Sequence, residues 1–300
     1  MPKKPVLLHF HIFKNAGMTF GWVLENNFQK DHVRMDDIDG KVLGSEIVKR
    51  FIEKYPSVKA FSCHNMDISI QNTSEIEFIK LIFIREPIDR ACSIYSYNKN
   101  VNTGKQESVE NAKKMKLQEY IEWHLENNTG QMQDTQTKYL TGFKSKDVEV
   151  AIKNLKETNV VCVVDRFDES MVIAEEHLKT KFPNVDLSYV IQNVTSENNI
   201  KIKEKIDGRK KELGVTGRKL EDNNKKDYAI YAEANKELDI KIQDIPDLEN
   251  KLYNFRQRCI EKRNIEIPNS VFRFPRLWYA ADKDQWFYKG WVNKSERFFD

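Results

Sequence analysis

Short apolar runs alternate along the chain with stretches in which apolar residues recur at helical spacing. A short apolar run bounded by turn residues is typical of a buried strand, whereas an apolar period of three to four residues is typical of a helix. The runs that predict strands are 6–12, 58–63, 79–84 and 160–164. The periodic stretches that predict helices are 20–28, 45–52, 117–125, 147–155, 169–178, 228–242 and 248–260. This alternation predicts an α/β fold, a single domain with a mostly parallel central sheet flanked by helices.

Polar segments interrupt this pattern. Residues 31–44 and 100–111 are polar and predict loops, and 136–142 predicts a compact turn. The stretch 198–226 has few apolar residues among many lysines, acids and asparagines, and predicts a polar insertion that is either solvated or a mobile helical excursion. The domain is therefore expected to span residues 1–264, and an aromatic-rich tail to span 265–300.

A strand, a turn and a helix follow one another near the N-terminus. A helix start presents unpaired backbone N–H groups and the positive end of the helix dipole, so it favours an anion. Lys14 adds a positive charge to the turn, Gly17 lets the backbone approach a ligand, and Thr19 offers a hydroxyl. These features predict a site for a phosphate-like group, although an ordinary turn with a surface lysine is the alternative. The lysine precedes the glycine, opposite to the order of a Walker A loop, which disfavours an ordinary ATPase or GTPase.

Two further strands are expected to end on polar residues. The run 79–84 is followed by Arg85, and Pro87 then opens a helix that carries Ser93 two turns later. An arginine fork and a serine hydroxyl can together hold a second phosphate, and a surface Arg–Glu pair is the alternative. The run 58–63 ends on His64. Because ligands bind at the carboxyl ends of the strands of an open α/β sheet, His64 is a candidate site residue, with an ordinary surface or core histidine as the alternative.

Bulk composition narrows the class of protein. The 300 residues carry a net charge of +3, which shows no nucleic-acid footprint. The four cysteines are scattered without a C-x-x-C pair, so they suit a reduced cytosol better than a disulfide framework or a zinc site. No run is long and apolar enough to span a bilayer. A cytoplasmic protein with no membrane span, no nucleic-acid partner and no metal is expected.

Together these stretches resemble the cofactor-dependent sulfotransferases, especially the branch of carbohydrate 2-O-sulfotransferases and their bacterial relatives. Residues 11–19 look like the phosphosulfate-binding loop of that family, 85–95 like its 3′-phosphate site, and 136–142 like its adenosine-side turn. Residues 166–170, 189–194, Asp227 and Tyr231 recur there too, so that the resemblance runs from Val6 to about Leu252. It implies a P-loop-like sulfotransferase fold. It also implies 3′-phosphoadenosine-5′-phosphosulfate (PAPS) as the donor and 3′,5′-adenosine bisphosphate (PAP) as the product.

The resemblance also implies roles for particular residues. Lys14 would steady the charge on the leaving phosphate oxygen, and His64 aligns with the catalytic histidine of the family. The implied cofactor-binding residues are Lys14, Asn15, Ala16, Gly17, Met18, Thr19, Phe20, Arg85, Ser93, Gln136, Thr137 and Tyr139. An acceptor hydroxyl on a carbohydrate or small metabolite would take the sulfuryl group. The tail 265–300 would pack on the body or on the acceptor site, and a homo-oligomer is left open.

Four positions depart from the family pattern. Phe13 stands where the family usually has proline, Ala16 where it has glycine, and Met18 where it has a hydroxyl residue. Glu86 replaces the aspartate that normally follows the arginine. Two alternatives therefore stay open: a non-catalytic nucleotide-binding protein that keeps the cofactor pocket, and a P-loop small-molecule kinase.

Overall fold

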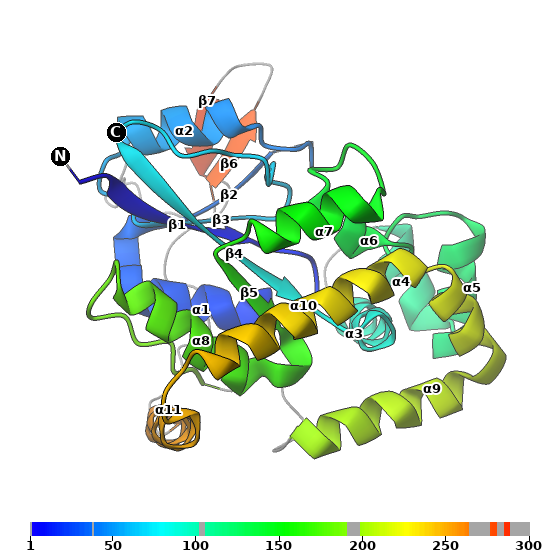
Figure 1. Cartoon of the computed structure of the whole chain (residues 1–300). Coiled ribbons are helices and arrows are strands. Elements are labelled where there is room, and N and C mark those ends of the chain that lie inside the picture. The colour runs from blue at the N-terminus through cyan, green and yellow to red at the C-terminus, as the bar shows by residue number, and fades with distance from the viewer. Residues whose placement is uncertain are drawn as a thin grey trace.

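The computed structural model describes residues 2–37, 39–101, 106–190, 199–263, 277–280 and 285–288. A seven-stranded sheet with strand order β5-β4-β1-β3-β2-β6-β7 lies at its centre (Figure 1). The strands are β1 (Lys4–Phe10), β2 (His32–Asp37), β3 (Ala60–Cys63), β4 (Ile76–Ile84), β5 (Val160–Val163), β6 (Leu277–Ala280) and β7 (Gln285–Tyr288). The first six in this order run parallel, and β7 pairs antiparallel with β6 at the edge.

Helices cover both faces of the sheet, because the side chains of a strand alternate between its faces. Leu7 of β1 packs in one core cluster with residues of α1 (Gly17–Phe28), α8 (Phe167–Lys179) and α11 (Leu248–Arg263). Leu8 packs in a second cluster with residues of α2 (Ser45–Lys54), α7 (Val148–Lys156) and α10 (Lys225–Gln243). The described residues thus form a single α/β domain of three layers, which confirms the predicted fold class.

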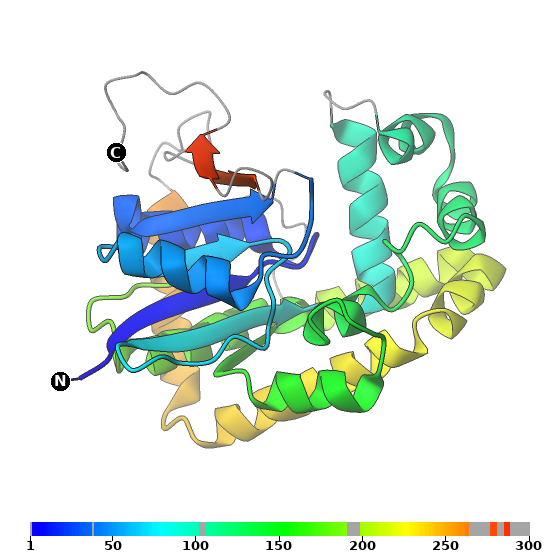
Figure 2. The same ribbon diagram turned by 90° about the horizontal axis from the view of Figure 1, so that it is seen from above.

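A third group of helices stands beside the sheet (Figure 2). It consists of α3 (Pro87–Asn100), α4 (Glu107–Lys114), α5 (Leu117–Glu126) and α9 (Asn199–Asp222), and its core includes Ile88, Tyr120 and Leu213. The short helix α6 (Thr135–Leu140) follows α5 in the chain and packs on α7 and α10. The 3₁₀ turns η1 (Gln29–Asp31) and η2 (Val164–Arg166) complete the elements. Within the described ranges, no helix is long and apolar enough to cross a membrane.

Three predicted loops or turns are wrong. Residues 31–44 contain strand β2, residues 107–111 begin helix α4, and residues 136–140 belong to helix α6. Strand β2 contains polar residues that are nevertheless buried, because they bond to residues distant in the sequence. The ring of His32 contacts the hydroxyl of Ser62 at 3.0 Å, and the carboxylate of Asp36 accepts the backbone N–H of His64 at 2.7 Å.

In its described part the polar stretch 198–226 is mostly helical, and only a minority of its residues are buried. It forms α9, whose backbone is non-helical at Gly214, and it packs on α3 and α5. The apolar residues Ile206, Leu213 and Leu220 are buried. Ile206 and Leu213 are seven residues apart before the break at Gly214, so they lie on one face of that part of the helix, and Leu220 is buried in the part after the break.

Only two short pieces of the aromatic tail are described. Strand β6 pairs parallel with β2, and its residues Leu277 and Tyr279 join the core cluster of Leu8. This β6 contact supports packing of that part of the tail on the body. Residues 264–276, 281–284 and 289–300, which include most of the predicted tail, lie outside the described residues.

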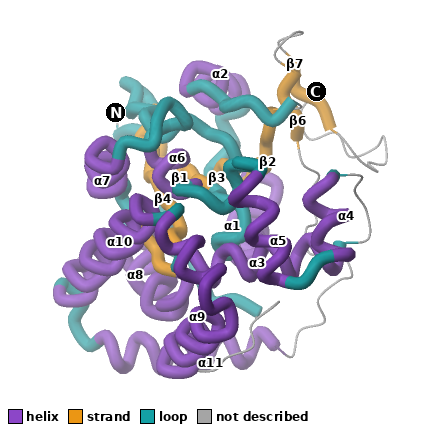
Figure 3. The backbone as a smooth tube through the Cα atoms, turned by 90° about the vertical axis from the view of Figure 1, so that its right-hand side faces the viewer, coloured by secondary structure: helices purple, strands orange, loops and turns teal. Residues whose placement is uncertain are grey.

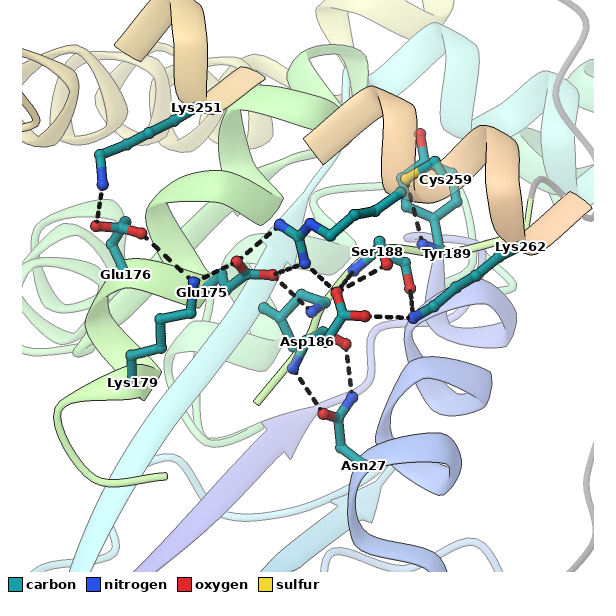
Figure 4. Close-up of polar contacts among 12 residues, drawn as sticks. Asn27, Glu175, Glu176, Lys179, Asp186, Ser188, Tyr189, Lys251, Cys259 and Lys262 are labelled. Atoms are coloured by element: carbon teal, nitrogen blue, oxygen red, sulfur yellow. Dashed lines mark hydrogen bonds and ion pairs between the residues drawn. The ribbon is translucent and has the colours of Figure 1, made fainter. Parts of the chain in front are cut away.

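A polar network fastens helix α11 to the body (Figure 4). The carboxylate of Glu175 on α8 is 3% exposed and accepts hydrogen bonds from Arg258 at 2.8 and 3.0 Å and from Lys179 at 2.7 Å. Arg258 also contacts Asp186, to which Lys262 donates at 2.8 Å. Asn27 of α1 bonds the backbone of Asp186 in both directions. A buried carboxylate needs such partners, and they fix the segment after α8 between α1 and α11.

Candidate functional site

The carboxyl ends of β1, β3 and β4 carry the predicted site residues. These parallel strands are neighbours in the sheet, so the turns that follow them meet at one edge. This edge belongs to the side that faces the viewer in Figure 3, where α3, α5 and α9 also lie.

The turn after β1 has a strained backbone. Lys14 and Ala16 have positive φ angles of 67° and 59°, a region that residues with side chains seldom adopt. Ala16 is the N-cap of α1 and gives the helix no side-chain cap. The N–H groups of Gly17, Met18 and Thr19 in the first helical turn therefore lack intrahelical acceptors. The φ of Ala16 explains the glycine that the family pattern has there, since glycine adopts this conformation without steric cost.

Lys14 is half-buried in this turn. Its ammonium lies 4.4 Å from the ring centroid of Tyr97 and 5.9 Å from that of Phe13. Burial, with a smaller contribution from the positive charge of Arg85, lowers the pKa of Lys14 to about 8. The lysine is thus a cation at neutral pH, in a place where a bound anion would restore its pKa.

Arg85 follows β4 and is tied to the turn. Its guanidinium donates to the carbonyl of Lys14 at 2.6 Å and to the carboxylate of Asp89 on α3 at 2.6 Å. Asp89 also pairs with Arg209 of α9. Burial lowers the pKa of Arg85 to about 10, which leaves the side chain positively charged. Lys205, also on α9, has its pKa lowered by burial and then by the charge of Arg85.

Glu86, at a position where the sequence departs from the family pattern, has a structural role. It is the N-cap of α3 and accepts the N–H of Asp89 at 2.6 Å. Its other oxygen accepts the hydroxyl of Tyr228 on α10 at 2.6 Å. Burial raises the pKa of Glu86 to about 7.

Asn15, Gln136 and Thr137 are buried and bond to the protein itself. The amide of Asn15 donates to the carbonyl of Phe83 at 2.7 Å and to Gln136 at 2.8 Å. Gln136 also accepts the N–H of Arg85 at 2.9 Å and donates to its carbonyl at 2.8 Å. Thr137 donates its hydroxyl to Asp227 at 2.8 Å. Through these bonds, α6 holds the turn after β1 and the end of β4 at a fixed separation.

His64 lies directly after β3. Its ring Nδ1 is 2.9 Å from the carbonyl oxygen of His11, and its backbone N–H donates to Asp36. A carbonyl oxygen can only accept, so this contact assigns the proton of the neutral ring to Nδ1 and leaves the lone pair on Nε2. The ring is also edge-on to Phe13, with 6.4 Å between centroids. Phe13 therefore contacts the side chains of both Lys14 and His64.

The other predicted residues occupy varied positions. Met18 is 42% exposed, Thr19 and Ser93 are half-buried, and Phe20 is buried in the core against His9 and Phe83. The hydroxyl of Tyr139 donates to Asn65 at 3.3 Å, and burial raises its pKa to about 12. Among the described residues, no cluster of histidine, cysteine and acidic side chains is arranged to hold a metal ion.

Sequence reasoning missed two basic residues at this edge. Lys205 and Arg209 lie in the stretch that was predicted to be a polar insertion, yet α9 brings their charges close to Arg85. The seven-residue spacing of Ile206, Leu213 and Leu220 was the available signal. A cavity of about 410 Å³ adjoins Arg209 between α3, α5 and α9. It is lined by Cys92, Tyr95, Ser96, Lys116, Leu117, Gln118, Arg209 and Glu212.

The fold and this edge define an α/β protein in which an uncapped helix start, Lys14 and Arg85 meet after the first strand. The chain matches the family model described as "Sulfotransferase family" over residues 1–256, and it belongs to that family. A protein of Archaeoglobus fulgidus, itself described as uncharacterized, is 29% identical over 239 residues. That alignment covers 75% of this chain and 94% of the archaeal protein. Membership of the family makes this chain a transferase of sulfuryl groups.

Proposed function

We propose that this protein transfers the sulfuryl group of PAPS to a hydroxyl of a carbohydrate or other small metabolite. The observation that carries the proposal is the convergence, at one sheet edge, of an uncapped helix start and the two partly buried cations Lys14 and Arg85. The donor has phosphate groups at both ends of its ribose, and these three features supply separate positive sites. The residues present fit the donor for this reason, and no resident metal is part of the proposal.

The donor would lie along the edge from α1 to α3. The N–H groups of Gly17, Met18 and Thr19, together with Lys14, would hold the 5′-phosphosulfate. The 3′-phosphate would be held by Arg85, Ser93, Lys205 and Arg209. Without the donor, the carboxylate of Asp89 is the counterion of Arg85 and Arg209. Asn15, Gln136 and Thr137 would shape the site through their bonds to the protein, and Tyr139 would border it next to Asn65.

The transfer itself is a displacement at sulfur. The acceptor oxygen forms the new S–O bond while the bond from sulfur to the 5′-phosphate oxygen breaks. Lys14 would stabilise the negative charge that develops on that phosphate oxygen. Nε2 of His64 would take the proton of the acceptor hydroxyl. By analogy with phosphoryl transfer, positioning and charge stabilisation supply most of the catalysis.

Calorimetric titration with PAP, beside ATP with Mg²⁺, tests the proposal. We expect tight binding of PAP, weak binding of ATP, and a large loss of PAP affinity in Arg85→Ala. The exposed pair of Asp222 and Lys225 offers a matched control, since the Lys225 side chain is 76% exposed, and Lys225→Ala removes only a surface cation and should leave the affinity unchanged. Preference for ATP would favour the kinase alternative. Tight PAP binding without transfer to any hydroxyl would favour a non-catalytic nucleotide-binding protein, an alternative suggested by Met18, which stands where the family has a hydroxyl residue.

The affinity for PAP is expected to fall as pH rises through about 8. Lys14 binds an anion only in its protonated form, and its pKa in the free protein is about 8. Below that pH the lysine is already charged, so the affinity should be nearly flat; above it, the affinity should fall by up to about tenfold per pH unit. Titrations at several pH values measure this. In Lys14→Arg the cation persists, so the fall above pH 8 should vanish, and an equal fall in this variant would exclude Lys14 as its cause.

A further inference from the structure

Three histidine rings form a column beside the proposed transfer site. The rings of His11 and His64 are stacked, with 3.9 Å between centroids and 29° between planes. On its other side His11 stacks with His9 at 5.2 Å and 16°. His11 is therefore the middle ring, and its own carbonyl oxygen is the acceptor that faces Nδ1 of His64.

Gly17 makes room for this middle ring. A Cβ atom built on Gly17 would lie 1.6 Å from Nε2 and 2.0 Å from Cδ2 of His11, so the His11 ring would have to move. The space that any other residue would fill at the start of α1 is thus filled by the His11 imidazole. The sequence suggested that this glycine serves the approach of a ligand, and the structure adds a steric reason within the protein. The ring of His11 is confined between α1 and His64.

His9, the ring at the end of the column opposite His64, is buried in the core. Nδ1 of His9 lies 3.1 Å from the hydroxyl of Ser62, and that hydroxyl also contacts His32 at 3.0 Å. The ring of His9 is edge-on to Phe20 with 4.8 Å between centroids. Burial lowers the pKa of His9 to about 3, so this ring is uncharged at neutral pH. The base of the column is therefore neutral, buried and held by hydrogen bonds.

From this geometry we infer that His11 is a positioning residue for His64. The stack fixes the plane of the His64 ring, and the carbonyl of His11 fixes its tautomer, so that Nε2 is presented to the acceptor hydroxyl in one orientation. His11 touches neither donor nor acceptor in this role. The inference rests on the proposed function, in which His64 is the base. It assigns to His11 a share of the turnover and no share of donor binding.

Two substitutions of His11 test the inference. His11→Ala removes the stacking ring, and His11→Phe keeps a flat ring without its nitrogens. Since a misplacement of about 1 Å can cost about 10²-fold in rate, His11→Ala should lower kcat by about 10- to 100-fold with little change in KM for PAPS. His11→Phe should recover most of the loss. A wild-type kcat in His11→Ala, or equal losses in both variants, would overturn the inference.

A double variant separates positioning from misfolding. Gly17→Ala alone should lose stability and PAP binding, because its Cβ meets the His11 ring. Combining it with His11→Ala removes the obstacle, so thermal stability and PAP affinity should return while kcat stays at the level of His11→Ala. A double variant with wild-type kcat would show that His64 does not need the ring.

The spectrum of His64 provides a readout that needs no substrate. In ¹H–¹⁵N spectra of the imidazole groups, wild-type His64 should show one tautomer with the proton on Nδ1 and a ring-current shift from His11. The shift should disappear in His11→Ala and persist in His11→Phe, and an unchanged spectrum in His11→Ala would refute the positioning. Failure of PAP to bind the wild-type protein would instead refute the proposed function, so the two failures can be told apart.

Discussion

Replacing His64 by alanine is expected to lower turnover by about 10²–10⁴-fold, the usual contribution of a positioned general base. PAP affinity should survive, because the proposed donor contacts come from the turn after β1 and from α3 and α9. Turnover is measured as PAP release from PAPS, with the best acceptor from a panel of simple sugars and alcohols. The expected result is a lower kcat at unchanged Kd for PAP.

A matched substitution sharpens this experiment. His177 on α8 lies in a different part of the fold, so His177→Ala should retain full turnover. His64→Gln keeps a polar side chain but has no basic nitrogen, and it should be as slow as His64→Ala. An unaltered kcat in either His64 variant would remove this residue from the role of base. Transfer would then depend on Lys14 and the helix start alone.

Those features of the site that depend on local pattern could be predicted from the sequence. The apolar run before Arg85 and the proline after it define a strand end and a helix start, and both are present as β4 and α3. The turn around Lys14 follows a strand and opens a helix, as predicted. The left-handed conformation of Ala16 could not be predicted from propensity, since alanine seldom adopts it.

Features that depend on distant partners could not be predicted. Strand β2 reads as a loop because its polar residues lack local partners, and Asp36 finds one 28 residues later in His64. The sequence predicted Gln136 as a site residue, but its bond to Asn15, 121 residues away, had no local signal. Arg209 of α9 lies beside Asp89, but the few buried apolar residues of α9 are hard to recognise among its many lysines. In each case a tertiary contact outweighs the local signal.

The bonds from Gln136 of α6 to Asn15 and Arg85 act as a clamp on the turn after β1 and the end of β4. The carboxylate of Asp227 is buried at the start of α6. This carboxylate is fully buried and accepts the backbone N–H of Gln136 at 3.0 Å, the backbone N–H of Thr137 at 2.8 Å and the hydroxyl of Thr137. Asp227 therefore supplies, from α10, the cap that the start of α6 needs. Burial raises the pKa of Asp227, while the hydrogen bonds from α6 act in the opposite direction.

Asp227→Ala is expected to destabilise the protein by about 3 kcal/mol or more, because three buried donors lose their acceptor and each costs about 1–3 kcal/mol. Denaturant unfolding measures this, with Asp222→Ala as the control. The side chain of Asp222 is 68% exposed and pairs with the exposed Lys225 at 2.9 Å, so its loss should cost well under about 1 kcal/mol. Asp227→Asn keeps one acceptor oxygen and should fall between the two.

Because Gln136 ties α6 to Asn15 and Arg85, Asp227→Ala should also lose PAP affinity under conditions where it is still folded. Unchanged PAP affinity in the folded variant would mean that the turn after β1 keeps its shape without the clamp.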